Sequence, residues 1–319
     1  MSRSVFSRAL LHPRYWLLWL GLGLLWLVVR LPYPVLLGLG RMLGAVMYWC
    51  MPERRRIAEV NLQLCFPDWS DARRQAVLRE NFASTGIAFF EMAMAWWWPS
   101  KRLSKLAHVE GLEYLQQVTA AGQGVVLMSM HFTTLEMGGA LLGQKFTIDG
   151  MYREHRNPAF DYVQRRGRER HNVDAKAIER EDVRSMFKSL RSGRAIWYAP
   201  DQDYGRRASV FVPFFGIQAA TVTATSTFAR LGKARVIPFT QVRLPNAQGY
   251  QLRLHPPLED YPSGDDEADA LRINQWIEQA IVQHPEQYMW VHRRFKTRPP
   301  GESRPYAKRR PRKQRRRRG

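Results

Sequence analysis

The chain is poor in several features that would define its chemistry at once. Its 319 residues include only two cysteines, Cys50 and Cys65, so a disulfide framework is excluded as its organising principle. His131 is not part of a His-Glu-x-x-His pair, which excludes the zinc-binding helix of metalloproteases. The glycines of segment 38–44 lack the Gly-x-Gly-x-x-Gly spacing of dinucleotide sites, and we interpret them as helix-packing residues. The chain also has no internal repeat, which excludes a solenoid.

Acidic residues are scarce as well. The chain has 28 acidic and 49 basic residues, and the net charge is +21. The C-terminal segment 308–319 holds nine basic residues and no acid, so the rest of the chain carries +12, which is 21 less 9. Such an excess fits an anionic lipid, a phosphorylated substrate, an acidic carrier protein or nucleic acid, and does not choose among them.

The N-terminal region predicts a membrane anchor. Residues 15–29 contain no charge, and a second apolar stretch at 35–51 is interrupted only by Arg41. Fifteen helical residues span about 23 Å, less than a hydrocarbon core of about 30 Å, so the segment either spans obliquely or lies in one leaflet. No small-x-small cleavage site follows, which favours a retained anchor over a secretory signal. We therefore divide the chain into an anchor at 1–52, a catalytic domain at 53–300 and a disordered basic tail at 301–319.

The central region alternates between strand and helix patterns. The stretch Gly124 to Met130 is apolar apart from Ser129 and predicts a buried strand. Further strands are expected at 146–152, 195–199, 235–240 and 250–255, and helices at 71–98, 158–170, 182–192, 222–231 and 267–282. This alternation predicts an α/β fold with a mixed sheet flanked by helices.

The first predicted strand is followed directly by His131. A helix, LEMGGALLG, begins a few residues later, so His131 is expected at the carboxyl edge of the sheet, where α/β folds bind ligands. A neutral imidazole there can act as a general base if a carboxylate holds its other nitrogen, and Glu136 is close enough in sequence to do so. The competing interpretation is a capping box, in which Glu136 bonds back to the amide of Thr133. Because no cysteine adjoins His131, a dyad of this kind would activate the substrate's own hydroxyl without a covalent enzyme intermediate.

Three other segments carry candidate binding residues. Arg165 and Arg168 lie in NPAFDYVQRRGRER, which is either a solvated helix face or a phosphate clamp. Asp201 follows the strand AIWYAP and either makes a turn or orients an arginine or a substrate group. Arg293 and Arg294, in PEQYMWVHRRFKTRP, indicate a basic, aromatic surface near a membrane or a phosphate.

Together these segments resemble the late acyltransferases of lipid A biosynthesis, the lauroyl/myristoyl transferase family of Gram-negative bacteria. The marks of the resemblance are HFTTLE, RGRER, WYAPDQDYG followed by SVFVPFFG, and PEQYMWVHRRFKTRP. Each is weak alone, but their order and spacing are specific. The resemblance extends from the apolar N-terminus to about Arg298 and leaves the basic tail outside it.

The resemblance implies a glycerolipid-acyltransferase-like fold and transfer of a lauroyl-like chain from acyl carrier protein to a hydroxyl of the anionic (Kdo)2-lipid IVA precursor. By this analogy His131 is the general base and Glu136 its orienting partner, Arg168 contacts a phosphate or the oxyanion, and Asp201 supports the site. No cofactor or metal is implied. The enzyme would act at the inner membrane, with its catalytic domain on the cytoplasmic side. The alternatives are an acyltransferase for another glycerolipid or glycolipid, and a membrane-tethered protein that binds nucleic acid through its basic tail.

Overall fold

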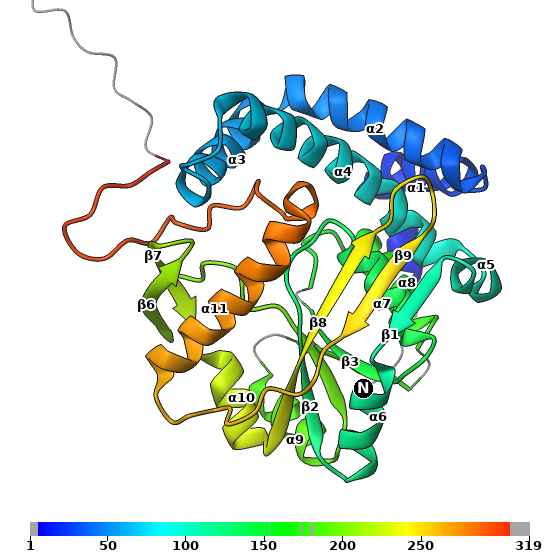
Figure 1. Cartoon of the computed structure of the whole chain (residues 1–319). Coiled ribbons are helices and arrows are strands. Elements are labelled where there is room, and N and C mark those ends of the chain that lie inside the picture. The colour runs from blue at the N-terminus through cyan, green and yellow to red at the C-terminus, as the bar shows by residue number, and fades with distance from the viewer. Residues whose placement is uncertain (1–5, 153, 173, 180–181, 307–319) are drawn as a thin grey trace, which may run out of the picture.

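A mixed sheet forms the centre of the protein in the computed structural model, which describes residues 6–152, 154–172, 174–179 and 182–306. Its seven strands follow the order β1-β9-β8-β2-β5-β3-β4 (Figure 1). The strands from β8 to β4 are parallel to one another, whereas β9 is antiparallel to β8 and β1 is parallel to β9. The strands are β1 (Ala107–Glu110), β2 (Gly124–Met128), β3 (Ile148–Tyr152), β4 (Ala177–Glu179), β5 (Ala195–Tyr198), β8 (Ala234–Arg243) and β9 (Tyr250–Leu254).

Helices cover both faces of the sheet and one of its ends. A separate antiparallel hairpin, β6 (Ser209–Phe214) with β7 (Ile217–Val222), packs beside α11. The α-helices are α1 (Trp16–Val28), α2 (Tyr33–Cys50), α3 (Pro52–Cys65), α4 (Asp71–Trp97), α5 (Ser100–Ser104), α6 (Leu112–Ala120), α7 (Leu135–Gly143), α8 (Pro158–Glu169), α9 (Val183–Arg191), α10 (Ala224–Gly232) and α11 (Asp266–Gln283). Three 3-10 turns are η1 (Arg8–Leu11), η2 (Pro13–Tyr15) and η3 (Pro285–Gln287).

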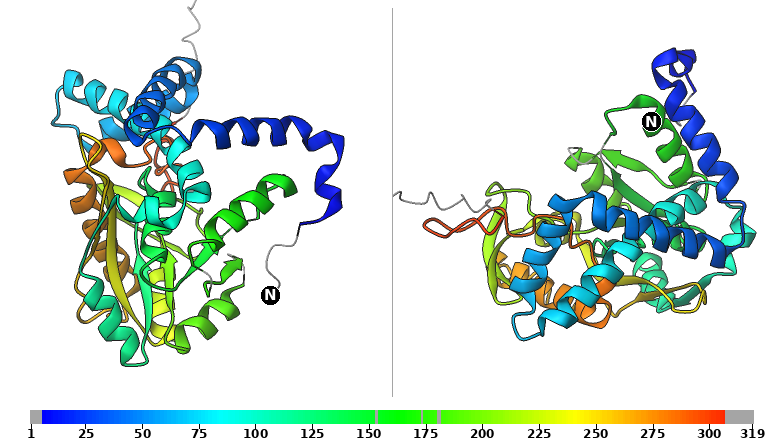
Figure 2. Two further views of the ribbon diagram at one scale, coloured as in Figure 1. Left: turned by 90° about the vertical axis from the view of Figure 1, so that its right-hand side faces the viewer. Right: turned by 90° about the horizontal axis from the view of Figure 1, so that it is seen from above.

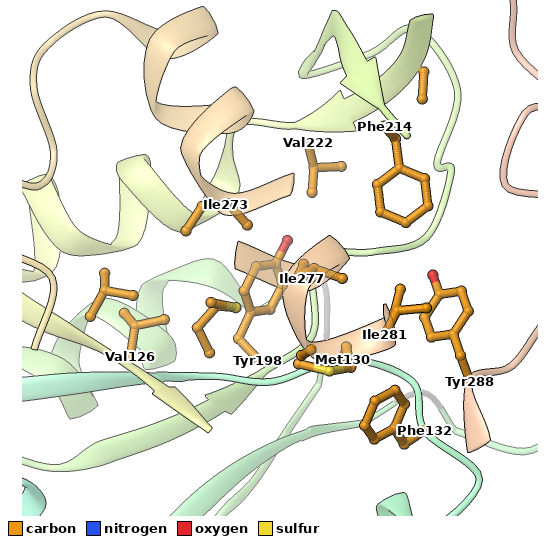
Figure 3. Packing of buried hydrophobic residues seen from close by; sticks show 14 of the residues in the cluster. Val126, Met130, Phe132, Tyr198, Phe214, Val222, Ile273, Ile277, Ile281 and Tyr288 are labelled. Carbon is orange, nitrogen blue, oxygen red and sulfur yellow. The ribbon is translucent and has the colours of Figure 1, made fainter. Parts of the chain in front are cut away.

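Strand β2 is buried along its whole length because both faces of the sheet are covered. Val126 and Met128 point into a core shared with α9, α10 and α11, part of which is drawn in Figure 3. Val125 and Leu127 point the other way, into a core shared with α6 and α7. This alternation fixes the strand's register, since a shift by one residue would exchange the two faces.

An upper layer of helices covers one end of the sheet. The side chain of Ser70 caps α4 by accepting a hydrogen bond from the amide of Arg73, and α2 lies along α4. Helix α1 leaves this layer and extends toward α8, so that Phe6 meets Tyr162 with ring centroids 5.5 Å apart (Figure 2). The N-terminal segment is therefore packed against both α4 and α8.

The mixed sheet flanked by helices is confirmed, and the expected strands and helices are present with ends that differ by a few residues. Strand β1 was missed because it is only four residues long, and the hairpin because Pro213 interrupts its pattern. Within the described ranges, no single helix is long and apolar enough to cross a membrane; α2 and α3, bent by 94°, pass that test only as a pair. The membrane anchor therefore stays a prediction.

The C-terminal boundary differs from the expected residue 300. The chain stays packed on the body as far as Tyr306, whose hydroxyl accepts a hydrogen bond from the amide of Phe295 and donates one to Asn61. The remaining residues of the expected basic tail, 307–319, lie outside the described residues.

Candidate active site

The register of two parallel strands brings His131 and Asp201 together. Met128 of β2 lies opposite Tyr198 of β5, and the amide of Ser129 donates to the carbonyl of Tyr198 over 2.9 Å. His131 is three residues beyond Met128, and Asp201 is three residues beyond Tyr198. Because parallel neighbours end at the same edge of a sheet, both side chains reach one point above the carboxyl ends of the strands.

Asp201 holds His131 through two hydrogen bonds. The imidazole Nδ1 lies 2.6 Å from Oδ1 of Asp201, and the backbone N–H of His131 donates to Oδ2 over 2.9 Å. The carboxylate is 1% exposed, whereas the imidazole is 21% exposed. One side of the ring is therefore fixed inside the protein, and no hydrogen bond of Nε2 is recorded among the described residues. We call this pair the His131–Asp201 dyad.

The turn that carries His131 is held from the other side by the C-terminal segment. The amide of Met289 donates to the carbonyl of His131 over 2.9 Å, and the amide of Thr133 donates to the carbonyl of Gln287 over 2.7 Å. The hydroxyls of Thr133 and Ser84 of α4 are 2.7 Å apart. The backbone on both sides of the imidazole is thus fixed before any substrate binds.

The pKa values of the dyad follow from this geometry. Burial alone would lower the pKa of His131, but the charge of Asp201 and the hydrogen bond to it outweigh burial, so the pKa lies above 6.5. Burial alone would raise the pKa of Asp201, and its interactions with His131 lower it instead. Asp201 is therefore ionised and can stabilise an imidazolium at His131.

The expected pairing of His131 with Glu136 is wrong. Glu136 lies on the first turn of α7, and its carboxylate accepts hydrogen bonds from both Nε (3.1 Å) and Nη2 of Arg168. The indole Nε1 of Trp96 lies 3.4 Å from the same carboxylate. The capping box does not form either. The N-cap residue of α7 is Thr134 instead of Thr133, and its side chain makes no capping hydrogen bond. Glu136 points instead toward α8, where Gly167 lets the helix approach Trp96 closely: a Cβ at residue 167 would lie 2.4 Å from Cγ of Trp96.

Comparison with known proteins identifies the family of this chain. A family model described as bacterial lipid A biosynthesis acyltransferase matches residues 3–297. The chain belongs to that family. It is 46% identical to the lipid A biosynthesis lauroyltransferase of Escherichia coli (strain K12) over 93% of this chain and 96% of that protein. It is 46% identical to the palmitoleoyltransferase of the same strain, over 93% and 97%. It is 32% identical to the myristoyltransferase, over 94% and 93%.

Among solved structures, a 1-acyl-sn-glycerophosphate acyltransferase from Thermotoga maritima aligns over 76% of this chain and 97% of that one. The TM-score is 0.36 and the sequence identity is 12%. The family assignment above rests on the sequence matches, which make the chain an acyltransferase of lipid A biosynthesis.

In this acyltransferase the other predicted arginines have separate environments. Arg165, one turn before Arg168 on α8, lies over the ring of Tyr152 at 5.2 Å. Arg293 forms a 2.5 Å ion pair with Glu53 of α3 and is half exposed. Arg168 is the only one of the predicted arginines that the structure joins to a residue of the HFTTLE segment, within the described residues.

The expectation that Arg294 binds a substrate phosphate is wrong, because the side chain is buried and bonded within the protein. Its side chain is 2% exposed, and its guanidinium donates to the carbonyl of Ala220 over 2.8 Å and to the hydroxyl of Thr221 over 2.9 Å. The ring of Phe214 lies 4.8 Å from the guanidinium carbon. Arg294 therefore ties the hairpin to the C-terminal segment, because the hairpin missed by the sequence pattern covers it.

A second imidazole in this acyltransferase lies close to the dyad. His292 Nε2 lies 3.3 Å from the backbone nitrogen of Asp203, which donates to it. Burial is the main reason that the pKa of His292 falls to about 4, so the ring is neutral near pH 7. This bond to a backbone amide ties His292 to the loop that carries Asp201.

A basic hollow adjoins the same loop. It has a volume of about 460 Å³, and four of its lining residues are basic: Arg206, Lys296, Arg298 and Arg304. Thr297, also in its wall, donates through its amide to Asp203 over 2.7 Å. The hollow is thereby fixed to the loop that carries Asp201. Within the described ranges, no group of three or more histidine, cysteine or acidic side chains is placed to hold a metal ion.

Proposed function

We propose that this enzyme moves a lauroyl-like chain from acyl carrier protein to a hydroxyl of the (Kdo)2-lipid IVA precursor. The observation that carries the proposal is the His131–Asp201 dyad at the carboxyl edge of the sheet, with one imidazole nitrogen held and the ring partly exposed. The names of the relatives, a lauroyltransferase and a palmitoleoyltransferase, support the class of acyl chain and of acceptor.

In the proposed reaction, Nε2 of His131 takes the proton of the acceptor hydroxyl as its oxygen attacks the thioester carbonyl. The imidazolium that forms is stabilised by Asp201, at 2.6 Å. The tetrahedral intermediate then collapses, its C–S bond breaks, and the departing thiolate receives the proton from His131. The new ester and the free thiol of the carrier are the products, and no acyl group is attached to the enzyme.

Arg168 is the proposed contact for negative charge. Glu136 holds its Nε and Nη2, which fixes the plane of the guanidinium. The Arg168 side chain is 38% exposed, so it is accessible from the solvent side. Oriented donors of this kind stabilise an oxyanion or bind a phosphate without reorganisation during the reaction. We assign Glu136 the role of positioning Arg168.

The charge of the surface supports anionic partners. Both acyl carrier protein and a phosphorylated, Kdo-bearing lipid are acidic, and the basic hollow lies beside the loop of the dyad. We propose that the enzyme works at the inner membrane with its catalytic domain on the cytoplasmic side. The proposal requires no cofactor beyond the acyl carrier protein thioester, because thioester transfer to a hydroxyl needs only a base and oxyanion donors.

The test uses the purified full chain, the lipid precursor and acyl carrier protein thioesters of different chain lengths, with mass spectrometry of the lipid. One added acyl chain, preferably lauroyl, is expected. Acyl-CoA and lysophosphatidic acid serve as the competing donor and acceptor. Transfer to lysophosphatidic acid but not to the lipid A precursor would contradict the proposed acceptor, and equal rates with acyl-CoA would contradict the proposed donor.

A further inference from the structure

The first two long helices expose an unusual amount of apolar surface. Of the 19 large apolar side chains that are exposed in the described residues, 14 lie before Pro52. On α1 and α2 they include Trp16, Leu17, Leu20, Leu24, Leu27, Val35, Met42, Val46 and Trp49. We call these nine residues the apolar stripe. An exposed apolar patch made of nine large side chains marks an interaction surface on a folded protein.

The stripe follows the period of each helix. On α1, Leu20, Leu24 and Leu27 are spaced by four and three residues, and Leu22 on the opposite side is buried. On α2, Met42, Val46 and Trp49 repeat the same spacing. Helix α2 therefore has one outward apolar face and one face against the protein, whereas α1 is apolar and exposed around most of its circumference, Trp26 included.

The inner face of α2 is attached to α4 by a close glycine contact. A Cβ at Gly40 would lie 2.5 Å from Cα of Ile87, and a Cβ at Gly86 would lie 2.3 Å from the backbone nitrogen of Gly44. Only glycines permit two helices to approach so closely. The stripe residue Met42 lies about 200° around the helix from Gly40, so this contact directs the stripe away from the body.

The charge within the first 52 residues has one sign, and Arg41 of α2 is paired with Glu80 of α4 at 3.0 Å. The first 52 residues contain five arginines and no acidic residue. The guanidinium of Arg30 lies over the ring of the exposed Trp26 at 4.1 Å, and that of Arg14 lies over the ring of the buried Tyr15 at 4.5 Å. Apolar faces bordered by arginine and tryptophan fit the boundary between acyl chains and anionic headgroups.

We propose that α1 and α2 form a platform that lies in the plane of a single leaflet of an anionic phospholipid bilayer. This rests on the proposed location at the inner membrane and adds how the protein meets it. Both helices lie on the upper surface of the molecule (Figure 2). The glycine contact keeps α2 on the catalytic domain, so the apolar stripe enters the leaflet while the domain stays at its surface.

The platform also places the dyad close to the lipid. Beneath α2 lies α4, and the hydroxyl of Ser84 on α4 is 2.7 Å from that of Thr133, two residues after His131. One helix layer, about 10 Å thick, thus separates the platform from the catalytic turn. The reactive hydroxyl of an acceptor anchored in the same leaflet would therefore need to move out of the leaflet by only a short distance to reach His131.

Vesicle binding tests the role of the stripe. The full chain and the variant Leu20→Glu/Val46→Glu are sedimented with vesicles of phosphatidylethanolamine and phosphatidylglycerol. The matched control is Leu231→Glu/Val282→Glu, at two apolar residues of similar exposure, 44% and 54%, outside the stripe. We expect the stripe variant to bind at least about tenfold more weakly and the control to bind within about twofold of the unchanged protein.

Acyl transfer to detergent-dispersed acceptor is measured in parallel, so a loss of folding or of the proposed reaction is distinguished from a loss of membrane binding. A stripe variant that is active in detergent and binds vesicles as tightly as the control would overturn the platform. A stripe variant inactive in detergent is replaced by Leu24→Gln/Trp49→Gln, judged by the same comparison.

Labelling tests the in-plane orientation. Cys50 is exposed and is changed by Cys50→Ser, whereas Cys65 is buried and can stay. Phe6→Cys and Ser303→Cys are then probed in sealed membrane vesicles with a membrane-impermeant maleimide. Labelling of both cysteines from the same side supports the platform. Labelling of the two positions from opposite sides would show that α1 crosses the bilayer and would overturn it.

Discussion

Asp201→Asn is the change that examines the dyad most directly. The two oxygens of Asp201 have different partners: Oδ2 accepts the backbone N–H of His131 at 2.9 Å, and Oδ1 lies 2.6 Å from Nδ1. An asparagine has one oxygen and one NH2 group. Since a backbone N–H requires an acceptor, the amide oxygen takes that position and the NH2 group faces Nδ1.

The variant therefore selects the wrong tautomer. With an N–H donor opposite it, Nδ1 must accept, so the ring proton moves to Nε2 and the nitrogen that should take the hydroxyl proton is occupied. The corresponding change in a serine protease triad lowers turnover by about 10⁴-fold, and we expect a loss of about 10³- to 10⁴-fold in kcat here. This equals about 4 to 5.5 kcal/mol of transition-state stabilisation.

The pH dependence gives a second readout. His131 must be neutral to act as a base, and its pKa lies above 6.5 because Asp201 outweighs burial. Activity of the unchanged enzyme should rise with pH, with its midpoint above 6.5. In the variant the carboxylate charge is gone and burial remains, so the midpoint of the residual activity should move to lower pH.

The assay is kcat/KM between pH 5 and 9 with a fixed acyl carrier protein thioester, with thermal unfolding as a check on folding. Asp203→Asn is the matched control. Its carboxylate is 2% exposed and accepts from Thr297 and Gly205, and no bond to His131 is recorded. If the midpoint of the pH profile stayed in place in Asp201→Asn and moved in Glu136→Gln, the His131–Asp201 dyad would be refuted. Glu136 would then be the partner of His131.

Three further changes have definite expected outcomes. Glu136→Gln removes the charge that orients Arg168, so kcat should fall by about tenfold or more while the midpoint of the pH profile stays in place, which initial rates across pH will show. Gly44→Val adds a side chain whose Cβ would lie 2.3 Å from the carbonyl oxygen of Phe82. The free energy of unfolding, measured by heat or denaturant, should fall by about 1–3 kcal/mol. An unchanged melting temperature would contradict the close packing of α2 on α4. Truncation after Tyr306 should leave acyl transfer largely intact, whereas loss of transfer would favour a function that resides in the basic tail.

The sequence predicted the sheet and the position of His131 for the same reason. A buried strand in an α/β protein needs an apolar run on both faces, and such runs at 124–130 and 195–199 are visible without coordinates. The helix after His131 followed from its own composition, and the observed α7 has the expected residues 135–143. Local pattern was sufficient for each element taken alone.

The partner of His131 depended on something that local pattern does not contain. Glu136 is near in sequence, but it lies on a helix that turns its carboxylate toward α8. Asp201 is 70 residues away and adjoins His131 only because β2 and β5 are neighbours in the sheet. A usable signal was present: each apolar run is followed within two residues by a titratable side chain, His131 after residue 130 and Asp201 after residue 199, and these side chains would align if the strands were parallel neighbours. Nothing in a single sequence states which strands are neighbours.

The exchange of partners changes what the HFTTLE segment does as a unit. If Glu136 served His131, the segment would be a self-contained dyad and Arg168 would be a separate binding residue. In the structure the segment instead connects two charge systems, because His131 is joined to Asp201 on β5's side and Glu136 to Arg168 on α8. The proposed base and the proposed anion contact are then fixed to one another through five residues of backbone. In the proposed reaction, a substrate bound to Arg168 through a phosphate or a developing oxyanion would lie at a position relative to Nε2 of His131 that the spacing between His131 and Glu136 determines.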